Sequence, residues 1–111
     1  MSINKVILVG RLGTKPELKN LPNTSLCTFT VATSEKYKDE EKTSWHRVKV
    51  FGKLAEVCNQ YLVKGREVYL EGKIDYGSYD NKDGVKIYTT DIIALSVQFI
   101  GDAVKEESNE F

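Results

Sequence analysis

One short segment alternates between two very different sets of side chains. The segment reads Trp45-His46-Arg47-Val48-Lys49-Val50-Phe51. Side chains two apart on a β-strand share a face, so a strand here has one face that is aromatic, basic, basic and aromatic in order. Because Arg and Lys are almost never fully buried without a partner, we expect this face to point to solvent. The histidine and the two valines then point to the core.

Exposed rings that flank cations suit a nucleic acid whose bases are unstacked, because rings stack on bases while cations contact phosphates. The alternative interpretation is a barrel strand with one solvent-exposed face, on which Trp45 and Phe51 pack against a neighbouring loop. Two other segments favour binding. Tyr37 lies among three lysines, and Tyr76 and Tyr79 lie in a polar stretch that contains glycines. Aromatic side chains on polar loops often serve to bind a ligand.

The residue types that carry catalysis or metal binding are not arranged for either task. His46 is expected on the inner face of its strand, with no Ser or Cys nucleophile placed beside it. Cys27 and Cys58 belong to no Cys-x-x-Cys motif, and a structural zinc site needs about four ligands. No glycine-rich phosphate loop ends in Lys-Ser or Lys-Thr. We therefore expect no catalytic residue, no metal and no cofactor.

The charge of the chain is balanced overall but not along its length. The 111 residues carry 16 basic and 16 acidic side chains. Residues 1–73 hold 13 of the basic and 8 of the acidic ones, whereas residues 102–111 hold 1 and 4. We expect one folded domain over residues 1–101 and an acidic, disordered tail over 102–111. The apolar run at residues 6–9 is too short for a signal peptide or a membrane span, which predicts a cytoplasmic chain without membrane contact.

Hydropathy patterns predict an all-β protein with one helix. The period changes from 2 to 3.6 after Gly52, so a helix is expected from Lys53, with Gly65 as its C-terminal cap. Polar segments at 34–43 and 76–84 are expected to be loops. The expected strands cover residues 4–12, with a bend at Gly10, and 26–33, 44–51, 66–74 and 85–100, with a break near Ala94. Three strands, a helix and two strands favour a five-stranded OB-fold Greek-key barrel with one helix between strands 3 and 4. A split βαβ fold or an SH3-like barrel is the competitor.

Short motifs spread along the whole chain add a family resemblance. They include Asn4-Lys5-Val6-Ile7-Leu8-Val9-Gly10, Trp45-His46-Arg47-Val48, Phe51-Gly52-Lys53-Leu54-Ala55-Glu56, Tyr61-Leu62-x-Lys64-Gly65, Val68-Tyr69-x-Glu71-Gly72 and Tyr88-Thr89-Thr90. With these motifs, collinear from about residue 3 to 100, the chain resembles the bacterial single-stranded DNA-binding protein family. The resemblance implies an OB-fold that assembles, usually as a homotetramer, and binds single-stranded DNA without sequence preference during replication, recombination and repair.

The resemblance also implies roles for particular residues. Four aromatic positions of the family stack on bases, and Tyr stands here at two of them where Trp is usual. Together with the basic residues near them, the expected DNA-binding residues are Tyr37, Trp45, Arg47, Lys49, Phe51, Lys53, Lys64, Lys73, Tyr79, Lys36 and Lys38. His46 matches a histidine of the family's subunit interface, and the expected oligomer interface comprises His46, Lys5, Ile7 and Val9.

The last ten residues depart most from the family. Its members usually carry a long linker with an acidic tip and a terminal Phe that recruit replication and repair proteins. Here the acidic residues and the Phe are present without the linker, so Glu107, Glu110 and Phe111 are the expected partner-binding residues. Such a short form resembles phage- or plasmid-encoded versions. The alternatives are an accessory OB-fold protein of the primosome type and a module whose aromatic face docks a protein.

Overall fold

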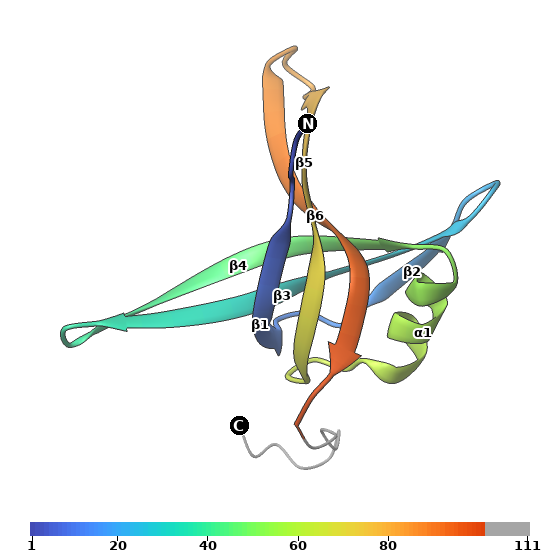
Figure 1. Cartoon of the computed structure of the whole chain (residues 1–111). Coiled ribbons are helices and arrows are strands. Elements are labelled where there is room, and N and C mark those ends of the chain that lie inside the picture. Colours follow the sequence, from blue (N-terminus) through green and yellow to red (C-terminus); the bar gives the residue numbers. More distant parts are fainter. Residues whose placement is uncertain (102–111) are drawn as a thin grey trace.

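Five strands close into a barrel in the computed structural model, which describes residues 1–101 (Figure 1). The elements are β1 Val6–Leu12, β2 Glu17–Asn20, β3 Ser25–Tyr37, β4 Glu40–Phe51, α1 Lys53–Tyr61, β5 Glu67–Asp80 and β6 Lys86–Phe99. The strand order is β1-β5-β6-β4-β3-β2, and an additional pairing of β1 with β3 closes the ring. The short β2, which lies outside this ring, was not expected.

The connections between these strands are those of the OB arrangement. β4 and β6 pair in parallel, while the other neighbours in the ring are antiparallel. The helix α1 connects the third strand of the ring, β4, to the fourth, β5. This is a five-stranded Greek-key barrel with one helix between strands 3 and 4. The predicted fold class is therefore confirmed, and the split βαβ and SH3-like alternatives are wrong.

β1 closes the barrel by changing partners at its end. It pairs with β5 from Val6 to Arg11, and Arg11 and Leu12 also pair with β3. A Cβ atom on Gly10 would lie 2.3 Å from the carbonyl oxygen of Ala32. Only glycine allows so close a backbone approach. The pairing with β5 continues in regular register through Gly10, so the bend that the sequence predicts there stays a prediction.

A single apolar core fills the barrel and reaches the helix. Val48 and Val50 of β4 are fully buried in it, and Ala55 and Cys58 of α1 cover one end. The predicted helix is confirmed, but it ends at Tyr61 and its C-cap is Leu62, which has an extended backbone. The prediction of Gly65 as the cap was therefore wrong. The backbone N–H of Gly65 instead donates to the carbonyl oxygen of Leu12, at 2.8 Å, in the turn that leads to β5.

Two hairpin arms project from the barrel in different directions (Figure 1). The β3–β4 pairing continues to Tyr37 and Glu40, and the β5–β6 pairing to Asp80 and Lys86. The loops predicted at 34–43 and 76–84 are thus mostly strands. The high density of charged residues was interpreted as a loop, but both faces of a projecting hairpin are exposed to solvent and accept charged residues. Residues of opposite charge also occupy facing positions across the first arm, where Lys42 is the register partner of Glu35.

The predicted break near Ala94 is confirmed as a bulge. The β5–β6 register shifts between Glu71, which pairs with Ser96, and Gly72, which pairs with Ala94. Leu95 is the extra residue and is exposed. Such a bulge increases the local bend of the strand, as barrel closure requires. In residues 1–101, no helix has the length and apolar character needed to cross a membrane.

Candidate nucleic-acid interface

The outward face of β4 carries the four side chains that alternation predicts to share it, Trp45, Arg47, Lys49 and Phe51. Trp45 and Phe51 are exposed, at 64% and 42% of their full surface, while Val48 and Val50 on the other face are fully buried. The predicted division into two faces is therefore confirmed. His46 lies half-buried on the inner side, and its Nε2 atom is 2.9 Å from the hydroxyl oxygen of Thr33.

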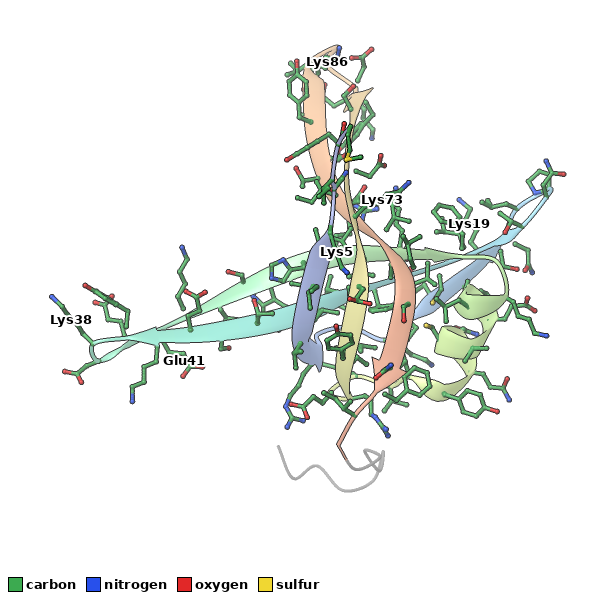
Figure 2. All side chains as sticks on the ribbon, viewed as in Figure 1. Lys5, Lys19, Lys38, Glu41, Lys73 and Lys86 are labelled. Carbon is green, nitrogen blue, oxygen red and sulfur yellow. The ribbon has the colours of Figure 1, made fainter. Side chains whose placement is uncertain are left out.

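This face continues across β6 to β5. The parallel pairing sets Lys49 of β4 beside Ile93 of β6, and Ile93 in turn pairs with Lys73 of β5. Tyr79 pairs with Ile87, six residues before Ile93, so alternation keeps both tyrosine and lysine on the same side of the sheet. Figure 2 shows Lys73 where the β5–β6 arm leaves the barrel. The structure thus brings Lys73 and Tyr79 onto the face that carries Trp45.

The tip of the β3–β4 arm places the predicted residues on both of its faces. Ala32 pairs with Trp45, and Tyr37 follows five residues later along β3, so alternation puts Tyr37 on the reverse side and Lys36 on the Trp45 side. Tyr37 is 75% exposed, and the Nζ atom of Lys38 lies 5.6 Å from the centre of its ring. Tyr37 is therefore not brought together with the other aromatic residues.

The loop after β1 contacts the indole ring of Trp45. A Cβ atom on Gly13 would lie only 2.3 Å from Cζ3 of Trp45. The loop is held by Gly13, whose N–H donates to the Thr30 carbonyl at 2.9 Å, and by Thr14, whose hydroxyl oxygen accepts from the Thr30 N–H at 3.1 Å. The alternative that Trp45 packs on a neighbouring loop is thus partly correct, although most of its surface stays exposed.

A buried carboxylate that was not predicted from the sequence lies at the centre of this face. Asp91 of β6 is only 4% exposed. Its Oδ2 atom is 3.2 Å from Nζ of Lys49, and its Oδ1 atom is 3.5 Å from Nε of Arg47. The sequence indicates this residue by one feature, an acidic side chain directly before the apolar run Ile92-Ile93-Ala94. Recognising it required the β4–β6 pairing, which the hydropathy pattern does not reveal.

The two remaining predicted cations flank the helix. Lys53 is the first residue of α1, directly after Phe51 and Gly52. Lys64 follows the helix in the turn that contacts Leu12. Both are exposed, and among residues 1–101 no carboxylate forms a salt bridge with either ammonium group. Their charges are therefore available to a ligand.

The residues predicted for an oligomer interface lie on β1, directly before it, and on β4. Ile7 and Val9 point outward from β1, each about half exposed at 53% and 51%. Lys5 precedes them and forms a salt bridge with Glu71, with 3.2 Å between Nζ and Oε1. From Val6 to Gly10, β1 pairs only with β5, so one edge of this strand has no partner strand in the described part of the chain. His46 lies on β4, where it pairs with Val31 of β3.

The two cysteines are core residues. Cys27 and Cys58 are free thiols and fully buried. Burial raises the pKa of Cys27 to about 11. Burial, with a smaller contribution from the neighbouring Cys27, raises the pKa of Cys58 to about 12. Residues 1–101 contain no group of three or more His, Cys, Asp or Glu side chains that could hold a metal ion.

Comparisons with known proteins agree with this geometry. The chain is 47% identical over 107 residues to a protein named single-stranded DNA-binding protein from Neisseria meningitidis serogroup A, which covers 91% of this chain and 62% of the relative. It is 46% identical over 106 residues to single-stranded DNA-binding protein 1 of Chlorobaculum tepidum, and this match covers 89% of this chain and 65% of the relative. The chain thus spans less than two thirds of the length of these relatives.

A solved structure and a family model agree with these relatives. The structure, titled "Plasmodium falciparum SSB complex with ssDNA", has a TM-score of 0.84 and 30% sequence identity, and the match covers 91% of this chain and 97% of that one. The model of the single-strand binding protein family matches residues 3–100. The resemblance found in the sequence is confirmed, and the chain belongs to the single-strand binding protein family.

Proposed function

We propose that this chain binds single-stranded DNA without sequence preference and protects it during replication, recombination and repair. The observation that carries the proposal is the outward face of β4, whose exposed Trp45 and Phe51 flank two cations and continue to Tyr79 on β5. Bases stack on these rings, while the cations contact phosphates. No covalent step is involved, so the chain acts as a binding protein rather than as an enzyme.

The proposed DNA path includes residues beyond the central face. The single-stranded DNA continues from Trp45 along the β3–β4 arm and crosses to the reverse side at the tip, where Tyr37 offers an exposed ring. The proposed phosphate contacts are made by Arg47, Lys49, Lys53, Lys64, Lys73, Lys36 and Lys38. Because these contacts release counterions from the DNA, binding weakens as salt rises.

Self-association is the second part of the proposal. Within residues 1–101, one edge of β1 from Val6 to Gly10 has no partner strand, and Ile7 and Val9 are exposed beside it. These features support an interface between copies of the chain, and we propose a homotetramer. Light scattering distinguishes this homotetramer from the accessory OB-fold alternative, which is a dimer.

Glu107, Glu110 and Phe111 lie outside the described residues, and we propose that they dock replication and repair proteins.

Trp45 allows a direct test of DNA binding because it is the chain's single indole. We expect its fluorescence to be quenched when oligo(dT) is added, and the quenching to diminish as salt is raised. Absence of both quenching and a salt-sensitive gel shift contradicts the proposal. Trp45→Ala should weaken binding of a labelled oligonucleotide by roughly 5- to 150-fold, which corresponds to about 1–3 kcal/mol for one stacked base.

Tyr61→Ala is the matched control, because Tyr61 is an aromatic residue of similar exposure that lies on α1, outside the proposed path. It should leave the affinity within about twofold of the unmodified chain, since a ring that stacks on no base contributes little. Equal weakening by both substitutions shows that base stacking on Trp45 is not the cause. Thermal unfolding of each variant checks that the fold is kept. If Trp45→Ala unfolds the chain, the ring serves the structure rather than the ligand.

A further inference from the structure

A carboxylate in the middle of a surface proposed to bind a polyanion is unexpected, and its surroundings show what it does. Asp91 is 4% exposed and lies where β6 runs parallel to β4. Nζ of Lys49 is 3.2 Å from Oδ2, and Nε of Arg47 is 3.5 Å from Oδ1. One buried anion is thus shared by two cations that come from alternate positions of the neighbouring strand.

The three groups depend on one another electrostatically. A carboxylate taken out of water is costly unless it is paired, so Asp91 holds both cations close to the sheet. Oδ1 has no hydrogen-bond donor in the described part of the chain and relies on the charge of Arg47. The side chain of Lys49 is more buried than that of Arg47, because 28% of it is exposed against 63% for Arg47.

This arrangement limits the positive charge offered to a ligand. Arg47, Lys49 and Asp91 together carry one net positive charge instead of two. A phosphate that attracts either cation away leaves the buried carboxylate less compensated. Moving Arg47 or Lys49 from Asp91 to a phosphate therefore costs free energy. An exposed lysine such as Lys73 binds a phosphate without this cost.

We propose that Asp91 is a positioning residue that acts as an internal counter-ion for Arg47 and Lys49, and so restricts the pair to about one phosphate contact. The inference rests on the proposed function, because it concerns the phosphates of the same single strand. Asp91 keeps the two cations ordered on the face and reduces both the affinity at low salt and its dependence on salt.

The test is a salt titration of oligo(dT) binding, followed through Trp45, with the unmodified chain and Asp91→Asn. The logarithm of the binding constant falls with the logarithm of salt concentration by about 0.7 for each phosphate of a single strand that is neutralised. Asp91→Asn frees one charge, so we expect tighter binding at low salt and a slope steeper by about 0.7. Binding that weakens at every salt concentration, with an unchanged slope, overturns the proposal.

Asp75→Asn is the matched control for charge. Asp75 pairs with Asp91 across the β5–β6 ladder and lies on the same face, but it is exposed and forms no salt bridge among residues 1–101. The substitution removes the same charge from the same region, so it should change the slope by much less. An equal steepening shows that the effect is long-range electrostatics, and the role of Asp91 is then rejected.

A double variant keeps the test decisive if Asp91→Asn alone does not fold because its two cations then repel each other. Lys49→Gln with Asp91→Asn is compared with Lys49→Gln alone, in which Asp91 compensates the charge of Arg47. The double variant frees the charge of Arg47, so we expect its slope to be steeper than that of Lys49→Gln by about 0.7. Equal slopes in the two variants contradict the proposal. If the unmodified chain shows no salt-dependent binding, the proposed function itself is wrong.

Discussion

At the scale of single residues, the contact between Gly13 and Trp45 is the most sensitive feature of the proposed site. A Cβ atom at position 13 would lie 2.3 Å from Cζ3 and 2.7 Å from Cε3 of the indole. Gly13→Ala therefore displaces the ring without requiring a forbidden backbone conformation. We expect a changed emission maximum of Trp45 and binding of oligo(dT) weakened about tenfold, within the range for one base stack.

Gly84→Ala provides the control for this substitution. Gly84 has a φ of 77° and no atom within 4 Å of its Cβ position, so alanine there strains the backbone but contacts nothing. It should lower the melting temperature and leave the emission of Trp45 unchanged. If Gly13→Ala leaves both the emission and the affinity as they were, the indole is not positioned by this loop.

Residue-scale features could be predicted from the sequence only where they belong to one strand. The two faces of β4 follow from alternation between Trp45 and Phe51, because the strand carries that pattern within itself. Asp91 and Gly13 reach the same surface from β6 and from the loop after β1. Their contribution depends on barrel closure and on a parallel pairing between distant segments, which periodicity does not specify.

At the scale of elements, the side chain of Asn4 attaches the N-terminal segment to the base of the β5–β6 arm. Nδ2 of Asn4 donates to the Ile74 carbonyl at 2.9 Å, and Oδ1 accepts from the Ile74 N–H at 3.0 Å. The amide thus imitates a paired strand just before β1 begins. Asn4→Ala should lower the free energy of unfolding by about 1 kcal/mol, the typical net value of such bonds. Hydrogen exchange of the Ile74 amide should become faster.

Asn4→Asp separates the two hydrogen bonds. The carboxylate still accepts from the Ile74 N–H but no longer donates to the carbonyl oxygen. We expect the Ile74 amide to keep most of its protection and the stability to fall by less than in Asn4→Ala. Exchange equally fast in both variants contradicts the pairing, since the acceptor alone should protect this amide.

The element scale also explains why the β3–β4 arm, and residues 76–80 of the β5–β6 arm, were mistaken for loops. The segment from Ser34 to Thr43 is polar and charged, which is typical of loops, yet its residues pair in register across β3 and β4. Backbone hydrogen bonds between strands do not depend on an apolar face, and both sides of this arm are exposed. Strands that pack on a core were predicted well, whereas strands that extend beyond it leave no hydropathy signal.

At the scale of the whole molecule, the stability of the barrel is coupled to the ionisation of two thiols. Cys27 lies on β3 and Cys58 on α1, so both are buried between the sheet and the helix that covers its end. Burial raises the pKa of Cys27 from 9.0 to about 11. Burial, and then the charge of Cys27, raise the pKa of Cys58 from 9.0 to about 12.

These shifts predict that stability falls in alkaline solution. Above pH 9 the thiols of the unfolded chain lose their protons, while those of the folded chain keep them until about pH 11 and 12. The unfolded state then binds fewer protons than the folded state, so the free energy of unfolding decreases as pH rises. The stabilisation is fully present below pH 9 and is lost progressively towards pH 11 and 12. Urea unfolding followed through Trp45 at a series of pH values measures it.

The cysteine contribution can be separated from that of other groups that titrate in the same range. Lysines and tyrosines ionise there too, but they are unchanged in the double variant Cys27→Ala/Cys58→Ala. That variant should be less stable at neutral pH, because it leaves small cavities in the core. Its stability should nevertheless decline less steeply between pH 9 and 11 than that of the unmodified chain. Parallel declines would mean that the thiols ionise equally in both states, and would contradict their burial between β3 and α1.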